Sequence, residues 1–459
     1  MTDGLTLAID KMRAAGVTDT AIAIFADYYA QLVAGTTGIV SEESIAPIGD
    51  VARLEDIATS PDDADAFGKT VMIRLNGGLG TSMGLSKAKS LLPVRGGLTF
   101  LDLIARQVLA ARAHYGVRLP LLFLHSFNTR DDCLAALAAY PDLAVDGLPL
   151  DMVQSQEPKL RADDLTPVEW PADPKLEWCP PGHGDIYPTL LDSGVLDAVL
   201  EAGFRYANVS NSDNLGASPS PELAGWFARS GAPFAAEITP RTPMDVKGGH
   251  LARRRSDGQL ILRESAQTRP EDMQYFTDPD IHPYASTNNL WFDLQVLRDV
   301  LEERGGVLGL PIIRNEKSVD PKDPSSPSVV QIESAMGAAI EVFHGATAIV
   351  VPRSRFLPVK TTNELVLLRS DVYEWGDDDI PRATVDTLPV VSLASKYKKI
   401  GDLEARMPSP LQLRGATSLT VTGDWTFGAD VSVIGDVTLG AEGGHIADGT
   451  TLEEHAPPA

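Results

Sequence analysis

The chain has 459 residues, with 39 Lys and Arg against 63 Asp and Glu, and it carries a formal net charge of −24. Its length and its 43% hydrophobic content are those of a globular protein with one large core or two to three domains. The acidic balance argues against nucleic acid and anionic membranes as partners, because both are polyanions. The two cysteines, Cys133 and Cys179, exclude a disulfide framework. The N-terminus shows no signal-peptide pattern and no run of 18 apolar residues occurs, so we expect a cytoplasmic protein.

The first elements in chain order are helical. Residues 5–35 contain two helical stretches, LTLAIDKMRAAG and AIAIFADYYAQLVAG, and we assign residues 1–70 to an N-terminal helical segment. Short apolar runs then alternate with helix-like stretches such as 101–114 and 189–202. This alternation predicts an α/β domain over residues 71–380, with a Rossmann-like, mixed and mostly parallel sheet that helices cover on both faces. The expected strands are VMIRL, LPLLFLH, YANVSNSD, APFAAEI, NNLWFDL and ATAIVVP.

The C-terminal part has a different pattern. We place a boundary at GDDDIP, residues 376–381, and expect residues 381–459 to form a linker helix and a β-solenoid that resembles a left-handed β-helix. Beyond Leu411 apolar residues alternate as in strands, and GDWTFG at 423–428 is repeated as GDVTLG at 435–440. Short repeated strands with glycine corners predict stacked coils, with a meander of hairpins as the alternative. In either case an unpaired edge allows a homo-oligomer to form through this domain.

The charge is unevenly distributed along the chain. Residues 1–70 hold 12 acidic and 4 basic side chains, and residues 411–459 hold 7 acidic and 1 basic. By contrast, residues 71–100 and 342–363 contain basic side chains and no acidic ones. Because a bound phosphate needs local positive charge, these two basic islands are the expected anion-binding regions.

The sequence NGGLGTSMGLSKAKS follows the first expected strand. Its glycine spacing matches neither the dinucleotide fingerprint nor a Walker P-loop. Gly80 to Gly84 form a G-x-S-x-G pattern, but Ser82 lies within a long loop and not on a sharp strand-to-helix turn, which argues against a hydrolase. A phosphate cradle fits better, because glycines let backbone N–H groups approach a ligand and because Lys87 and Lys89 follow.

This loop closely resembles the nucleotide loop of the eukaryotic-type UTP–glucose-1-phosphate uridylyltransferases, the UDP-glucose pyrophosphorylases. The resemblance extends from about residue 71 to the C-terminus, and several blocks in order are more specific than one motif. The other blocks are SFNTRDD, QSQEPKL, CPPGHGDIY, VSNSDNLGA, DVKGG, STNNLWFDL, IESAMGAAI and PRSRFLPVKTT. The loop departs from the family at Lys87 and Ala88, where Gly-Pro is common, and this departure concerns the shape of the loop and not Lys89.

The resemblance implies a glycosyltransferase-A-like nucleotidyltransferase that converts UTP and glucose 1-phosphate into UDP-glucose and pyrophosphate. A phosphate oxygen of the sugar phosphate attacks the α-phosphorus of UTP in line, with Mg²⁺ as cofactor and without a covalent enzyme intermediate. Such a reaction requires two polyanions to be aligned and their charge to be neutralised, and it needs no nucleophilic side chain.

The resemblance also implies which residues bind the nucleotide. Four consecutive residues would bind the uridine through their backbone: Leu75, Asn76, Gly77 and Gly78. Gln154 would read the edge of the uracil, for which a primary amide offers both a donor and an acceptor. Gly182 would lie on the base, and His183 would contact the sugar or a phosphate. Cys179 and His183 could suggest zinc, but no second Cys/His pair lies nearby in the sequence.

The implied catalytic groups are Lys89, Lys360 and Asp213. The two lysines come from the two basic islands and would contact phosphates. Asp213 would hold Mg²⁺, because this ion favours a carboxylate together with substrate phosphates. Asn211 would bond to the sugar. The residues expected around the hexose are Lys247, Gly248, Glu264 and Asn288.

Other interpretations remain open at this stage. A UDP-N-acetylhexosamine or broad UDP-sugar pyrophosphorylase is the other enzymatic interpretation, although the loop differs from the GGQGTRLG type of the acetylhexosamine enzymes. A non-catalytic UDP-sugar sensor or scaffold is the interpretation from another class, against which the lysines and Asp213 argue. We leave Arg353 and Arg355 out of the catalytic set, as structural ion pairs.

Overall fold

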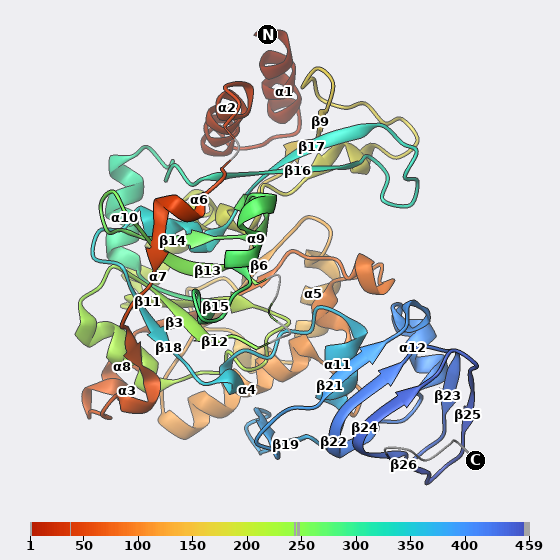
Figure 1. The fold of residues 1–459 in the computed structure, drawn as a ribbon. Helices are drawn as coiled ribbons and strands as arrows, with labels where there is room; N and C mark the ends of the chain where they lie inside the picture. The colour runs from red at the N-terminus through yellow and green to blue at the C-terminus, as the bar shows by residue number, and fades with distance from the viewer. Residues whose placement is uncertain (1, 37, 243–244, 246–247, 454–459) are drawn as a thin grey trace.

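The structure is a computed structural model that describes residues 2–36, 38–242, 245 and 248–453. Its centre is an eight-stranded sheet (Figure 1). The strand order is β2 (Ala52–Arg53), β18 (Thr347–Val350), β12 (Phe234–Pro240), β15 (Tyr284–Asp293), β11 (Tyr206–Asn211), β3 (Thr70–Asn76), β6 (Leu121–His125) and β7 (Asp151–Val153). β15 runs antiparallel to both of its neighbours, whereas all the other neighbouring pairs are parallel. The predicted mixed and mostly parallel sheet is therefore confirmed.

Helices cover both faces of this sheet, as the sequence predicts (Figure 1). One face packs against α6 (Ile186–Asp192), α7 (Val195–Glu201) and α10 (Leu294–Glu303). The other packs against α3 (Asp62–Gly68), α4 (Phe100–Tyr115) and α8 (Pro221–Ser230). Alternate residues of β3 enter opposite clusters, Val71 and Ile73 on one side and Met72 on the other. This follows from the two-residue period of a strand.

The expected helices differ from the observed ones in one place. α4 covers the predicted 101–114, and it begins at a capping box in which Thr99 and Asp102 bond reciprocally. The stretch 189–202 is not one helix, because the chain turns at Gly194, with φ of +71°, between α6 and α7. The N-terminal stretch forms two helices, α1 (Thr2–Ala14) and α2 (Asp19–Val33).

Outside the central sheet, α1 and α2 lie at one end of the molecule (Figure 1). They share an apolar cluster with a small sheet of β16 (Ile312–Ser318), β17 (Ser328–Ser334) and β9 (Leu160–Arg161). A further sheet joins β1 (Ile45–Pro47), β13 (His250–Arg254) and β14 (Leu260–Arg263). Short elements fill the connections: α5 (Arg130–Leu137), α9 (Met273–Phe276), β4 (Pro93–Arg95), β5 (Leu98–Thr99), β8 (Glu157–Pro158) and β10 (Trp178–Cys179). No helix in the described ranges is long and apolar enough to cross a bilayer.

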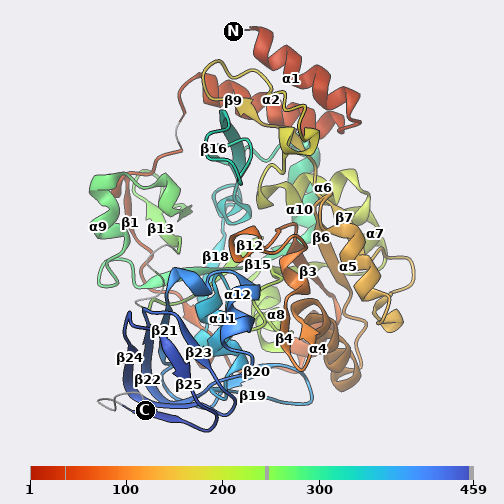
Figure 2. The same ribbon diagram turned by 90° about the vertical axis from the view of Figure 1, so that its right-hand side faces the viewer.

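The C-terminal strands form two parallel sheets at the opposite end from α1 and α2 (Figure 2). One sheet contains β21 (Val390–Leu393), β22 (Gln412–Val421), β24 (Ser432–Leu439) and β26 (Thr451–Glu453), and the other contains β23 (Trp425–Phe427) and β25 (Gly444–Ile446). Before them come α11 (Thr362–Arg369), the hairpin of β19 (Tyr373–Trp375) and β20 (Pro381–Ala383), and, between β21 and β22, α12 (Ile400–Arg406). The parallel pairing excludes the meander of hairpins, and the described residues form no closed solenoid.

The 12-residue sequence repeat does not mark the pairing of these strands. Trp425 in the first copy lies in β23 and pairs with Gly444, whereas Val437 in the second copy lies in β24 and pairs with Leu419. The two copies therefore lie in different sheets. Trp425 is 19 residues from its partner, so the period that builds the sheets is longer than the one seen in the sequence.

Candidate active site

The glycine loop leaves the sheet at the carboxyl end of β3. Its two arms are joined by hydrogen bonds, since the Gly80 N–H donates to the Lys87 carbonyl at 3.4 Å and the Lys89 N–H donates to the Gly78 carbonyl at 3.1 Å. A Cβ added at Gly80 would lie 2.5 Å from the Leu85 side chain, so this close folding requires glycine. The loop thereby returns Lys89 to the edge of the sheet from which it started.

Lys89 meets Asp213 at this edge. Asp213 follows β11, which is the parallel neighbour of β3, so the chain segments after both strands lie side by side. The Lys89 Nζ and Asp213 Oδ2 atoms are 2.5 Å apart, and the two side chains are 21% and 14% exposed. Two of the three predicted catalytic side chains therefore form an ion pair that is mostly buried but remains partly exposed to solvent.

Val359, the residue before Lys360, is held at Asp213 by a backbone hydrogen bond. The Val359 N–H donates to the Asp213 carbonyl at 3.3 Å, which places the exposed Lys360 next in the chain. Burial raises the pKa of the Glu264 carboxyl, and the positive charge of Lys360 acts in the opposite direction. Both basic islands, which are far apart in sequence, therefore converge on Asp213.

Asn211 and Asn288 meet beside this cluster, because β11 and β15 are neighbours in the sheet. The Asn288 Nδ2 group donates to the Asn211 Oδ1 atom at 3.0 Å. Asn288 has a left-handed backbone, with φ of +58°, next to an irregularity in the pairing of β12 with β15. Asparagine tolerates this conformation better than most residues do, and the irregularity redirects its side chain.

Gln154 lies against the first glycine of the loop. Its N–H donates to the His125 carbonyl at 2.8 Å, and the residue is buried. A Cβ added at Gly77 would lie 2.9 Å from the Gln154 Oε1 atom. The lack of a side chain at Gly77 therefore lets the amide of Gln154 approach the loop.

Leu75 and Asn76 support the loop from inside the protein. The Leu75 carbonyl accepts from the Ser212 N–H at 3.1 Å, and the Asn76 carbonyl accepts from the Thr129 hydroxyl at 2.7 Å. The buried Asn76 side chain lies 3.3 Å from the Nδ1 atom of His125. Their carbonyl groups and the Asn76 side chain are thus engaged within the protein.

Gly182 and His183 form a half-buried corner next to Asp185, which bonds to the neighbour of Gln154. Gly182 has a φ of +84°, and a Cβ there would lie 2.5 Å from the Ser334 carbonyl oxygen. Burial lowers the pKa of His183, and its Nδ1 atom accepts from the Met336 N–H at 2.9 Å. The neutral ring therefore carries its proton on Nε2. Cys179 does not join His183 in a metal site: no group of three metal-binding side chains occurs in the described part of the chain.

Among the residues predicted to surround the hexose, the Gly248 carbonyl accepts from Arg241 at 3.1 Å. A Cβ at the adjacent Gly249 would lie 2.6 Å from the Glu264 carboxylate, so this carboxylate lies against the glycine pair. Lys247 lies outside the described residues. Arg353 and Arg355 form ion pairs as predicted, with Asp245 at 2.6 Å and with Glu237 at 2.8 Å respectively.

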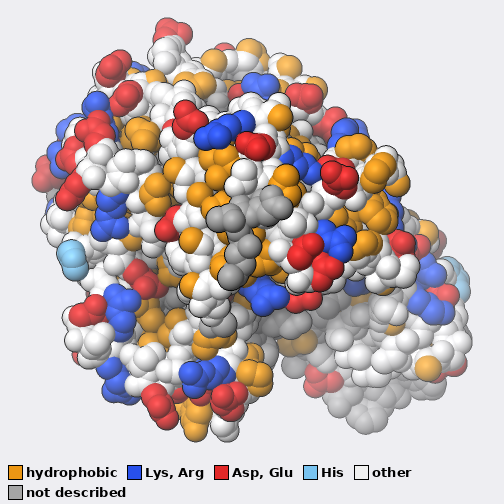
Figure 3. Space-filling view, turned by 90° about the horizontal axis from the view of Figure 1, so that it is seen from above, with side chains coloured by type: hydrophobic (Ala, Val, Ile, Leu, Met, Phe, Trp, Pro, Cys, Tyr) orange, Lys and Arg blue, Asp and Glu red, His pale blue; other side chains and the backbone are white. Residues whose placement is uncertain are grey.

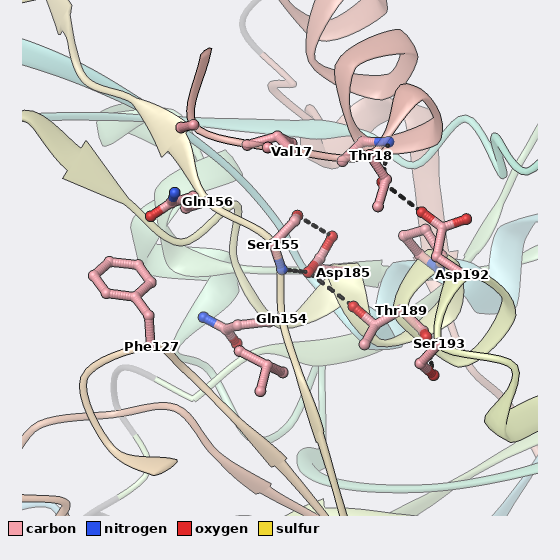
Figure 4. A pocket seen from close by; sticks show the side chains of 15 residues that line it. Val17, Thr18, Phe127, Gln154, Ser155, Gln156, Asp185, Thr189, Asp192 and Ser193 are labelled. Carbon is pink, nitrogen blue, oxygen red and sulfur yellow. Dashed lines mark hydrogen bonds between the residues drawn. The ribbon is translucent and has the colours of Figure 1, made fainter. Parts of the chain in front are cut away.

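The sequence reasoning missed several residues beside the predicted ones. A cavity of about 360 Å³ adjoins Gln154, and Ser155 and Asp185 both line it (Figure 4). Ser155 lies in the block QSQEPKL and Asp185 lies in the block CPPGHGDIY. Their closeness in sequence to Gln154 and His183 is therefore the only feature that could have pointed to them. Nothing in the sequence shows that the two blocks touch.

Comparison with known proteins adds an independent result. The family model described as UTP–glucose-1-phosphate uridylyltransferase matches residues 22–433. The potato (Solanum tuberosum) protein of that name is 39% identical over 399 residues, which cover 86% of this chain and 81% of the potato protein. The Saccharomyces cerevisiae protein of that name is 37% identical over 410 residues, which cover 88% of this chain and 81% of the yeast protein.

Solved structures agree over nearly the whole chain. A crystal structure of a variant of Leishmania major UDP-glucose pyrophosphorylase, in complex with UDP-Glc, superposes with a TM-score of 0.93, at 40% identity and 99% coverage of both chains. A Trypanosoma brucei structure described as UDP-glucose phosphorylase gives a TM-score of 0.91, at 39% identity, and covers 98% of this chain and 100% of its own. By its family model, its relatives and its fold, this chain belongs to the UTP–glucose-1-phosphate uridylyltransferase family.

Proposed function

We propose that this chain transfers the uridylyl group of UTP to glucose 1-phosphate, forming UDP-glucose and releasing pyrophosphate. The family assignment and the crystal structure of a relative with UDP-Glc support this activity. The observation that carries it in this chain is that Lys89 pairs with Asp213 and that the backbone just before Lys360 is bonded to the same residue. Lys89 follows the glycine loop, and Asp213 follows β11. An arrangement of two cations and a carboxylate at one sheet edge suits the transfer of a uridylyl group from one polyanion to another.

In this proposal each group has a separate task. Gly77, Gly78 and Gln154 bind the uracil, with Gly182 and His183 on the other side of the nucleotide. Lys89 and Lys360 neutralise the phosphate oxygens and hold the acceptor phosphate in line with the α-phosphorus, so that catalysis comes from alignment and charge. The hexose lies near Asn211, Asn288, Gly248 and Glu264, with Lys247 as a further candidate.

The family implies a divalent metal ion, which we take to be Mg²⁺. The residues present fit this ion, because Asp213 supplies one carboxylate and Mg²⁺ usually takes one or two carboxylates together with phosphates and water. When bound, the ion would neutralise charge on the phosphates.

We further infer the organisation in three parts, residues 1–70, 71–380 and 381–459. The 19-residue offset between Trp425 and Gly444 supports the view that the C-terminal strands stack as coils of a solenoid. Such stacking leaves β21 and β26 at the two edges of their sheet, and a second copy of the chain could pair there.

The proposed activity is tested by incubating the purified chain with UTP, glucose 1-phosphate and Mg²⁺. We expect pyrophosphate to appear in amounts equal to UDP-glucose, and we expect the rate to fall when a chelator is added. Binding of UDP-glucose by calorimetry without any release of pyrophosphate would overturn the enzymatic proposal and favour a sensor. A panel of other sugar 1-phosphates measures how broad the acceptance is.

The same assay tests the role of Lys89. Lys89→Ala should lower kcat by about 10²–10³-fold, because removal of one charge-stabilising group at a reacting centre has this effect. The dissociation constant of UDP-glucose should change far less. Lys322→Ala is the control, since Lys322 is exposed and is not among the predicted site residues, and it should retain most of the rate. Equal losses of kcat and of binding in Lys89→Ala would reduce Lys89 to a binding residue.

A further inference from the structure

Asp185 joins two segments that are about thirty residues apart and that both contact the predicted base site. One carboxylate oxygen, Oδ2, accepts from the Ser155 N–H at 2.6 Å, and the other, Oδ1, accepts from the Ser155 hydroxyl at 2.8 Å (Figure 4). Oδ2 also accepts from the Thr189 hydroxyl at 3.0 Å. Three hydrogen bonds to one carboxylate bind the segment after β7 to the start of α6.

The bond from Ser155 has a direct consequence for Gln154. The N–H groups of Gln154 and Ser155 are consecutive, and they donate to the His125 carbonyl at 2.8 Å and to Asp185 at 2.6 Å. The two peptide units that flank the Gln154 Cα are therefore each held by one hydrogen bond, the first by His125 and the second by Asp185. Because these two units set the direction in which the Gln154 side chain leaves the backbone, Asp185 helps to set where the amide lies relative to Gly77.

Asp185 occupies a position where a carboxylate costs free energy. The residue is 6% exposed, and burial raises the pKa of its carboxyl to about 6. It directly precedes α6, but in the described part of the chain its side chain makes no capping bond to the backbone N–H groups of that helix. The carboxylate is directed to Ser155 instead, so capping of α6 does not account for an acid at this position.

A primary amide cannot discriminate uracil from cytosine unless its position is fixed. Uracil presents an N–H donor and a carbonyl acceptor at its pairing edge, whereas cytosine presents an acceptor and an amino donor. The amide of a glutamine offers a donor and an acceptor and fits either base after a half-turn. Selectivity therefore requires a surrounding structure that keeps the amide in one place against the base.

We propose that Asp185 is a positioning residue that, through Ser155, holds Gln154 in the place from which it selects uridine over cytidine nucleotides. This inference rests on the proposed function, in which Gln154 reads the base. Asp185 itself touches Ser155 and Thr189 and contributes through them. The substrate class that it favours is a uracil nucleotide.

The test compares kcat/KM for UTP and for CTP, with glucose 1-phosphate as acceptor, in the full-length chain. Asp185→Ala should reduce the UTP/CTP ratio about tenfold, the effect of losing one charge-assisted hydrogen bond. The KM for glucose 1-phosphate should stay within about twofold, because the sugar contacts lie elsewhere. Asp185→Asn should restore most of the ratio, since its carbonyl oxygen still accepts from the Ser155 N–H.

The matched control is Asp192→Ala. Asp192 lines the same cavity, but its carboxylate accepts from the Thr18 hydroxyl at 2.6 Å and holds the N-terminal turn (Figure 4). Its removal should leave the UTP/CTP ratio unchanged. If Asp185→Ala does not fold, Ser155→Ala replaces it. This variant loses one of the two bonds to Asp185 and should lower the ratio by a few-fold.

An unchanged UTP/CTP ratio in Asp185→Ala, or in Ser155→Ala where that variant is used, would overturn the proposal, whether kcat/KM falls equally for both nucleotides or stays at the wild-type value for both. Calorimetric binding of UDP-glucose and CDP-glucose gives a second readout that does not depend on turnover. A wild-type chain that binds UDP-glucose selectively without releasing pyrophosphate contradicts the proposed activity but not the role of Asp185, so the two failures are distinguishable.

Discussion

Buried polar side chains beneath the glycine loop hold it in place. His125, at the end of β6, is fully buried, and its Nδ1 atom lies 3.3 Å from the Asn76 amide. Its carbonyl accepts a hydrogen bond from the Gln154 N–H, so one residue supports both the loop and Gln154. Burial lowers the pKa of the His125 ring to about 4, because no solvent stabilises the charged form.

His125 should therefore make stability depend on pH. Between about pH 6.5 and 4 the unfolded chain binds a proton at His125 that the folded chain excludes, so stability is lost as the pH falls through this window. The loss amounts to about 3 kcal/mol for a shift of this size. His125→Asn keeps an acceptor for Asn76 and should remove that part of the slope, as measured by urea unfolding between pH 4 and 7.

The exposed His445 provides the control for this measurement. In His445→Asn the curve of stability against pH should run parallel to that of the wild type. The other buried histidines are present in all three proteins, so their contributions cancel in the comparison. Parallel curves for His125→Asn and the wild type would contradict the assignment of the low pKa to His125.

At the scale of elements, the start of α11 sets the position of Lys360. Thr361 and Glu364 form a capping box, in which the Thr361 N–H donates to Glu364 at 2.6 Å and the Thr361 hydroxyl accepts from the Asn363 N–H at 3.2 Å. This box fixes the first turn of the helix directly after Lys360. The capping box can be recognised in the sequence KTTNE, because its residues are close to one another in the sequence.

Thr361→Ala should destabilise the protein by about 1 kcal/mol, the usual cost of removing a helix cap. Thr361→Ser retains the hydroxyl and should lose much less. Urea unfolding of the two variants beside the wild type measures the difference. An equal loss of stability in Thr361→Ala and Thr361→Ser would mean that the methyl group of Thr361, and not its hydroxyl, is responsible for the effect.

The C-terminal elements show a limit of sequence patterns. The alternation of apolar residues predicts strands correctly from Leu419 onward, since inward and outward positions alternate in any strand. The 12-residue spacing of the GDxTxG repeat is not the spacing of paired strands, because glycine and aspartate mark turns and not partners. The strands pair in parallel with partners 18 to 20 residues away, and 28 residues away for β21 with β22.

At the scale of the whole molecule, a buried ion pair joins the central sheet to the segment that carries Lys360. Glu237 in β12 is fully buried and accepts from Arg355 at 2.8 Å and from the Trp291 ring N–H at 2.9 Å. The Arg355 carbonyl in turn accepts from the Asn214 amide at 3.1 Å. The positive charge of Arg355 helps hold the pKa of Glu237 below its usual range, against the effect of burial.

Glu237→Gln should therefore destabilise the whole molecule. It leaves the buried Arg355 without a counter-charge, and removal of one partner from a buried pair costs about 3–5 kcal/mol. Glu316→Gln is the matched control, because Glu316 pairs with Arg314 at 3.4 Å with both side chains about half exposed. The free energies of unfolding measured in urea should differ clearly between Glu237→Gln and Glu316→Gln. A loss below about 1 kcal/mol in Glu237→Gln would contradict the role of this pair.

The net charge of −24 also has a whole-molecule explanation. Acidic and basic side chains are interspersed on the face shown in Figure 3, so the excess of acid does not form one continuous patch there. The site itself draws on the two acid-free stretches, which lie more than two hundred residues apart and meet at Asp213. An acidic protein can thus hold two polyanions, because the local charge near a ligand counts more than the total.

The sequence by itself determined the class of fold, most of the strands of the main sheet, the two basic islands and the residues that carry the family resemblance. These features depend on local periodicity and on side-chain types, which the sequence displays directly. The tertiary structure decided which of these residues meet. The Lys89–Asp213 pair, the Asn211–Asn288 contact and the bond from Ser155 to Asp185 all join distant segments. Strand order creates these contacts, and it results from packing of the whole chain, which no local pattern records.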